Sequence, residues 1–140
     1  MTKTMKIIIS SVVIIAIILG GGLVYMHEKQ EAFHQEMVDI VKSKEATNIF
    51  EDGILKLDSK AFTKEGIIQN YSVDYSTIEH NPMGGIDGTL YINNQKKLYV
   101  RFTLNSNNDD ELDKDSGISG YSAQLDKLLE GAKSNNEGNI

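Results

Sequence analysis

The sequence contains no cysteine, no tryptophan and a single proline among its 140 residues. Without cysteine the chain forms no disulfide, offers no cysteine nucleophile and cannot be lipid-modified at an N-terminal cysteine. We therefore expect its folded part to be stabilised by an ordinary hydrophobic core. The proline, Pro82, is followed one residue later by two glycines, and this combination is typical of a turn.

Charge is absent from residues 7–26, which begin with Ile7 and end with Met26. A helix of this length spans about 30 Å, the thickness of the hydrocarbon core of a bilayer. Lys3 and Lys6 precede the span, and positive residues favour the cytoplasmic side of a membrane. We predict a cytoplasmic N-terminus (residues 1–6), a single-pass transmembrane anchor in the cell membrane (residues 7–26), and the remainder outside.

A cleaved signal peptide is the alternative interpretation of this segment. Such a signal has a shorter apolar core and a cleavage site of the small-x-small type. The three glycines at residues 20–22 resemble a cleavage context, whereas residues 23–26 do not. The length of the span favours an uncleaved anchor.

Basic residues are scarce after the span. All 20 acidic residues lie there with only 12 of the 14 basic ones, which gives this part of the chain a net charge of −8. This balance argues against nucleic acid as a partner, because nucleic-acid binding needs a basic surface. It also argues against electrostatic docking on anionic lipid.

Apolar periodicity predicts an α+β domain over residues 27–131. Residues 28–58 have helical spacing and form either one long helix weakened at Gly53 or two shorter helices. Alternation with a period of two predicts antiparallel strands over residues 67–75, 86–93 and 97–105, the last two joined by a hairpin at residues 93–96. Residues 122–130 read as a short helix, with Leu125, Leu128 and Leu129 toward the core, that stops at Gly131.

The resulting architecture is an N-terminal transmembrane helix and a small α+β domain. In this domain a helix packs on an antiparallel sheet of about three strands, and a short C-terminal helix or an extra strand completes it. We predict a disordered tail over residues 132–140.

The segment EHNPMGGI, residues 79–86, is the main candidate for function. Its chemistry predicts a type II turn with Pro82 in the second position, and such a turn presents His80, Asn81 and Met83 to a partner. Alternatively, His80 acts as a general base in a pocket that Asp87 also lines. No serine lies in a nucleophile context, so we predict no enzyme activity and no catalytic residue.

Two segments contain side chains of the kinds that bind metal ions. In the acidic loop 106–116, the alternating residues Asp109, Glu111, Asp113 and Asp115 are calcium-type ligands, but the spacing fails the EF-hand pattern. His27 and His34 lie about two helical turns apart, too far for one ion. We therefore expect an exposed acidic loop and predict neither a metal ion nor a cofactor.

Four segments together resemble a known family. They are LDSKAFTKEGII (residues 57–68), YSVD (71–74), HNPMGGI (80–86) and YINN (91–94). Their order is similar to that in domain-of-unknown-function family 1310, which comprises small membrane-anchored or secreted proteins of low-GC Gram-positive bacteria. The likeness covers most of the chain, and HNPMGG is its most specific part. The resemblance implies a location in the bacterial envelope. It implies no particular activity, substrate or catalytic residue.

The favoured function is a non-enzymatic interaction module of the bacterial envelope. We predict that it binds an envelope protein or peptide through a sheet edge or through the turn at residues 79–86, with contacts from His80, Asn81, Met83 and Tyr91. The alternative is a small-ligand-binding protein or envelope enzyme with a pocket near His80 and Asp87.

The anchor is tested by membrane extraction. We expect the protein to stay in the membrane pellet when membranes are washed at high salt or at alkaline pH, because neither treatment weakens apolar burial in lipid. Immunoblots of pellet and supernatant measure this directly. A shortened, soluble form in the supernatant would instead show a cleaved signal.

Overall fold

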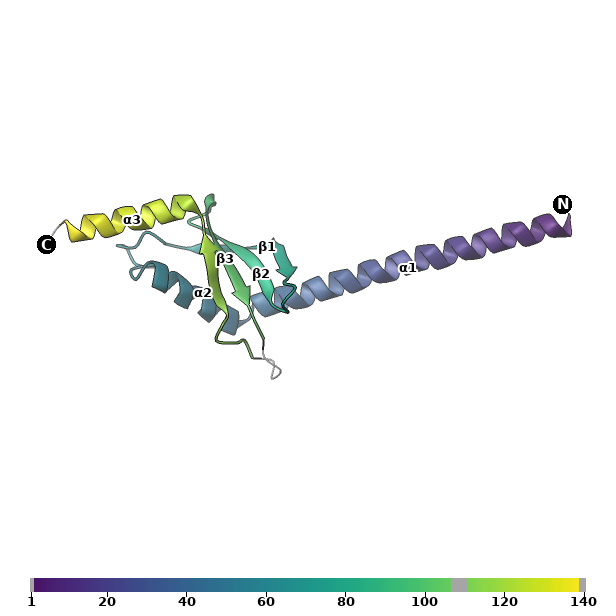
Figure 1. Cartoon of the computed structure of the whole chain (residues 1–140), viewed down its shortest axis with the longest axis horizontal. Coiled ribbons are helices and arrows are strands. Elements are labelled where there is room, and N and C mark those ends of the chain that lie inside the picture. Colours follow the sequence, from purple (N-terminus) through teal and green to yellow (C-terminus); the bar gives the residue numbers. More distant parts are fainter. Residues whose placement is uncertain (1, 107–110, 139–140) are drawn as a thin grey trace. The chain divides into compact units, whose positions relative to one another are not determined.

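The computed structural model describes residues 2–106 and 111–138. The elements in chain order are α1 (Lys3–Val41), α2 (Lys44–Leu57), β1 (Tyr71–His80), β2 (Ile86–Ile92), β3 (Gln95–Leu104), β4 (Gly117–Tyr121) and α3 (Ala123–Glu137) (Figure 1). The chain divides into two compact units, residues 1–36 and residues 37–140. The predicted α+β class is confirmed, although the described part of the sheet has four strands rather than about three.

The first unit consists of the N-terminal part of α1, an uninterrupted helix of 39 residues (Figure 1). Within the described residues, α1 is the one helix long and apolar enough to cross a membrane, and its most apolar window buries nothing inside the protein. Beyond the apolar stretch, polar contacts begin. The Lys29 ammonium lies 4.9 Å from the centre of the Tyr25 ring, and His27 Nε2 lies 3.0 Å from a carboxylate oxygen of Glu31. By length and composition, this helix suits either a membrane anchor or a signal sequence.

The second unit is built on an antiparallel sheet with strand order β1-β2-β3-β4. Alternate residues of β2 and β3 are buried, as the period-two pattern predicted. These inward residues are Ile86, Gly88, Leu90 and Ile92 of β2 and Leu98, Val100, Phe102 and Leu104 of β3. The hairpin between the two strands turns at Asn93 and Asn94, which both have positive φ, as two-residue hairpin loops of type I′ require.

Two helices, not one, occupy residues 28–58. The break lies at Ser43, whose Oγ accepts a hydrogen bond from Ala46 N–H at 3.2 Å and donates one to the Ile40 carbonyl at 2.6 Å. A serine in this position satisfies a donor that the first turn of α2 would otherwise leave unpaired. On α2, Ala46, Phe50 and Ile54 follow at intervals of four residues and are buried. The break thus lets α2 turn its apolar stripe toward the core.

The first strand lies later in the chain than its pattern predicted, at Tyr71–His80 instead of 67–75. Residues 67–70 alternate like a strand, but side chains satisfy their backbone. Asp58 Oδ2 accepts a hydrogen bond from Ile68 N–H at 3.0 Å, and Asn93 Oδ1 accepts one from Gln69 N–H at 2.8 Å. Because a carboxylate and an amide take up these donors, the segment needs no neighbouring strand.

Residues 117–121 form β4, which the sequence pattern had left open as an extra strand. The strand is short, contains two glycines and has an irregularity between its pairings with Arg101 and Phe102. Because of these features, β4 does not show the alternation of apolar residues that is typical of a strand. β4 occupies one edge of the sheet and β1 the other.

The predicted end of the last helix is wrong. α3 runs through Gly131 to Glu137, so residues 132–137, predicted as part of a disordered tail, are helical. Glycine weakens a helix but does not end it unless the backbone takes a positive φ, and Gly131 is not one of the described residues that do. Leu125 and Leu129 are buried as predicted, whereas Leu128 is 45 % exposed.

Gly53 is the contact point between α2 and β4. A Cβ added to it would lie 2.4 Å from Cγ1 of Ile118. Glycine destabilises a helix interior by about 1 kcal/mol relative to alanine. Gly53 thus weakens α2 but allows the helix to pack closely against Ile118.

We expect Gly53→Ala to destabilise the second unit by about 1–3 kcal/mol, because the overpacked methyl group must displace the stiff side chain of Ile118. Gly131→Ala on α3 is the matched control, since its Cβ would meet nothing within 4 Å. It should stabilise by up to about 1 kcal/mol. Urea unfolding of the two variants in detergent, followed by circular dichroism, measures both. Equal stabilisation by both substitutions would rule out the close contact.

Candidate functional site

The turn between β1 and β2 is built by Asn81. Gly84 N–H donates to the Asn81 carbonyl at 2.9 Å, and Asn81 N–H donates to the Gly85 carbonyl at 2.7 Å. The side-chain Oδ1 of Asn81 also accepts a hydrogen bond from Met83 N–H at 2.8 Å. The asparagine thus holds the turn from both its backbone and its side chain.

The predicted type II turn is wrong. That type needs positive φ at its third residue, Met83, which is not one of the described residues with positive φ. Instead Gly84 has φ +99°. Asparagine first, proline second and glycine fourth fit a type I turn followed by a glycine bulge, the usual three-residue hairpin loop. Gly85 lies close to β3, since an added Cβ would be 3.0 Å from the Leu104 carbonyl oxygen.

The predicted partner-binding residues of this turn have different surroundings. Asn81 is half-buried, and its Nδ2 donates to Asp87 Oδ2 at 3.3 Å. Asp87 Oδ1 accepts a second hydrogen bond from the Thr103 hydroxyl at 2.8 Å. Met83 is 94 % exposed, and His80 is exposed at the end of β1. Asn81 therefore stabilises the turn, while the side chain of Met83 is exposed to solvent.

His80 and Asp87 do not share a face of the sheet. His80 pairs with Ile86, which is buried, whereas Asp87 pairs with Glu79. Residues directly opposite on paired strands project to the same face, and neighbours along a strand project to opposite faces. The register thus separates the histidine from the carboxylate that the pocket hypothesis paired with it.

The side chain of Tyr91 also forms a hydrogen bond within the protein. Its hydroxyl donates to Asp74 Oδ2 at 2.7 Å, and this hydrogen bond raises the pKa of Tyr91. The pKa of Asp74 is lowered, first by the hydrogen bond from the Ser76 hydroxyl and then by the one from Tyr91. Asp74 and Ser76 lie where β1 departs from regular pairing, between Asp74 and Glu79. Tyr91 thus helps to hold the irregular part of β1.

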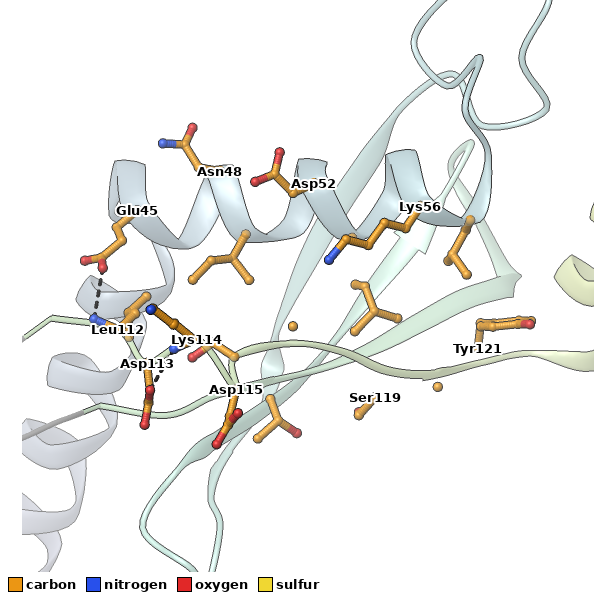
Figure 2. Close-up of a pocket in the computed structure, with 18 residues that line it drawn as sticks. Glu45, Asn48, Asp52, Lys56, Leu112, Asp113, Lys114, Asp115, Ser119 and Tyr121 are labelled. Carbon is orange, nitrogen blue, oxygen red and sulfur yellow. Dashed lines mark hydrogen bonds between the residues drawn. The ribbon is translucent and has the colours of Figure 1, made fainter.

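A groove lies between α2 and the segment that leads into and through β4. It is an open groove of about 880 Å³ (Figure 2). Ile49 and Leu57 of α2 and Ile118 of β4 are partly buried against the core and line it. Figure 2 shows α2 as one wall of the groove and the chain from Leu112 to Tyr121 as the other.

Polar side chains border this groove on both walls. On α2 they are Glu45, Asn48, Asp52 and Lys56, at helical spacing, and on the opposite wall they are Asp113, Lys114, Asp115, Ser119 and Tyr121 (Figure 2). A carboxylate oxygen of Glu45 accepts a hydrogen bond from Leu112 N–H at 2.9 Å and so connects the two walls. Periodicity in the sequence did not indicate this site, because one of its walls is the strand that the pattern left open.

The sequence model of a family described as protein of unknown function (DUF1310) matches residues 6–128. This chain belongs to the DUF1310 family. The resemblance inferred from the four sequence segments is therefore confirmed. No curated protein and no solved structure is significantly similar to the chain.

The DUF1310 match includes both the hairpin turn and the whole groove, since residues 45–121 lie within it. The family description assigns no function to these residues.

In residues 2–106 and 111–138, no three histidine or acidic side chains converge in a way that would hold a metal ion. Of the calcium-type ligands in the acidic loop, Asp109 lies outside the described residues. The carboxylate of Asp113 accepts a hydrogen bond from Lys114 N–H at 2.7 Å.

The Tyr91–Asp74 hydrogen bond makes stability depend on pH in the alkaline range. The pKa of Tyr91 in the folded protein is raised above its ordinary value of 10.0. The contribution of the protonated hydroxyl to the free energy of unfolding is therefore fully present below pH 10 and is lost as pH rises through the folded pKa. Tyr91→Phe should remove part of this alkaline loss and return the pKa of Asp74 toward its ordinary value. Thermal unfolding between pH 7 and 11 measures the first effect.

Tyr99→Phe is the matched control, because Tyr99 lies directly opposite Tyr91 on β3. It should leave the alkaline loss of stability as in the wild type. If Tyr91→Phe and Tyr99→Phe gave the same pH profile, the hydrogen bond to Asp74 would not be responsible.

Proposed function

We propose that this DUF1310 protein is a non-enzymatic interaction module of the bacterial envelope. Residues 7–26 anchor it in the cell membrane, with Lys3 and Lys6 on the cytoplasmic side and the second unit outside. The module binds an extended peptide segment of an envelope protein along the groove between α2 and β4. The observation that carries this proposal is the position of β4 at the edge of the sheet, beside an open groove.

An edge strand has backbone N–H and C=O groups directed away from the sheet, and an extended peptide pairs with them as an added strand. β4 offers these groups with little obstruction. Gly117 and Gly120 have no side chains, and a Cβ on either would meet nothing within 4 Å. Ser119, between them, is small and exposed. The strand also lacks the lysine and proline that commonly protect an edge from pairing.

The opposite edge, β1, is less suited to strand addition. Its pairing is interrupted over the four residues between Asp74 and Glu79, whereas the irregularity in β4 involves Ser119 alone, and side chains occupy the interruption in β1. The Thr77 hydroxyl donates to the Asp74 carbonyl at 2.6 Å and accepts from Thr89 N–H at 3.0 Å. The backbone there is irregular, so an added strand would find few evenly spaced partners.

The hairpin turn is a second candidate contact, favoured by the 94 % exposure of Met83. Methionine adapts to irregular apolar surfaces, and the rigid turn would present it without loss of backbone entropy. His80, at the base of the turn, would lie at the margin of such a contact. Asn81 and Tyr91, both engaged within the fold, would support it indirectly.

Photo-crosslinking in intact cells tests the proposal. A photoreactive residue at Asn48, on the α2 wall of the groove, should capture a discrete protein partner. Ser119→Lys and Ser119→Pro should remove that adduct, because a lysine or proline blocks pairing to an edge strand. Ser72→Lys, an exposed position on β1, is the matched control and should leave the adduct intact.

A photoreactive residue at Met83 distinguishes the two contacts. Capture from Met83 but not from Asn48 would move the binding site from the groove to the hairpin. If neither probe captured a protein above background, the interaction function would be abandoned. Unfolding curves of the two Ser119 variants show whether loss of the adduct reflects blocked pairing or a lost fold.

A further inference from the structure

The groove between α2 and β4 has an uneven charge. Among the described residues that line it, four are carboxylates (Glu45, Asp52, Asp113 and Asp115) and two are lysines (Lys56 and Lys114). The carboxylates come from both walls, so a ligand in the groove lies between them (Figure 2). A groove bordered mainly by one sign of charge concentrates ligands of the opposite sign.

The lysines do not neutralise these carboxylates by direct pairing. Within residues 2–106 and 111–138, no ion pair within 4.0 Å joins Lys56 or Lys114 to a carboxylate of the groove. Two of the four carboxylates are held in place by backbone N–H groups: Glu45 by Leu112 and Asp113 by Lys114. Such hydrogen bonds orient a carboxylate without removing its charge.

Between the charged borders the groove is apolar, at Ile49, Leu57 and Ile118. Side chains of a strand alternate between its two faces. A peptide added to β4 would therefore place every second side chain in the groove, where the apolar residues and the carboxylates both lie, and direct the others to the opposite face of the sheet. The side chains that enter the groove thus determine its selectivity.

We infer that the ligand of the groove is an extended peptide whose groove-facing positions, every second residue, carry lysine or arginine together with apolar residues. This inference rests on the proposed function and specifies its partner as a basic segment of an envelope protein. The carboxylates contribute specificity and rate of association, while the backbone of β4 and the apolar surface contribute most of the affinity.

Selection from a random peptide display library tests the inference. The bait is the full chain in detergent micelles, and peptides that also bind Ser119→Lys or Ser119→Pro are subtracted. We expect the remaining peptides to be enriched in lysine or arginine at every second position. A selected peptide is then titrated against carboxylate variants of the full chain by fluorescence anisotropy.

Asp52→Asn and Asp115→Asn should each weaken binding about two- to fivefold, the range typical of exposed charge pairs, and the loss should shrink as salt is raised. Glu130→Gln is the matched control. Glu130 is an exposed acidic residue of α3 that does not line the groove, and its substitution should leave the affinity unchanged.

The outcomes separate the two levels of the proposal. Enrichment of neutral or acidic peptides that depend on Ser119 would overturn the inferred basic ligand and leave the strand-addition function standing. Peptides that bind the wild type and both Ser119 variants equally would overturn the groove function itself. Equal losses for the groove variants and for Glu130→Gln would assign the effect to net charge and overturn the inference.

Discussion

The second unit depends on the position of one aromatic ring. Phe102 of β3 lies over Gly88 of the neighbouring strand, where a Cβ would be 2.4 Å from its ring, and its centroid is 4.5 Å from that of Phe50 on α2. Both phenylalanines are at most 1 % exposed. The missing side chain at Gly88 thus makes room for the ring on which α2 packs. With α2 so placed, Gly53 approaches Ile118, and the groove follows from the gap between helix and edge strand.

Polar side chains satisfy several backbone hydrogen-bonding groups that are not paired within a helix or between strands. Asp58 and Asn93 satisfy the backbone of the loop before β1, Asp74 the irregular part of β1, and Asn81 the hairpin turn. A backbone donor outside regular helix or strand pairing needs another partner, and a nearby carboxylate or amide supplies one. This explains why several residues that look like candidate ligands in the sequence are engaged in the fold.

Part of the excess negative charge of the chain lies on the walls of the groove. A net charge of −8 after the apolar span argues against nucleic acid as a partner but points to no surface. The structure gathers part of that charge on the two walls beside β4, where an apolar strip and an unpaired strand edge also lie. Charge, apolar surface and backbone groups at one place suit a peptide better than a small molecule or a nucleic acid.

Local sequence patterns suffice to predict the α+β class, the apolar N-terminal helix, the faces of β2 and β3 and the family. Each of these rests on periodicity, length or local motifs, which act over a few residues. The remaining features follow from tertiary contacts. The start of β1 depends on hydrogen bonds that Ile68 N–H and Gln69 N–H donate to the side chains of Asp58 and Asn93, and the glycines of β4 interrupt its apolar pattern. The separation of His80 from Asp87 needed the strand register, and the groove needed α2 beside β4. All of these depend on contacts between distant segments, and no local pattern encodes such contacts.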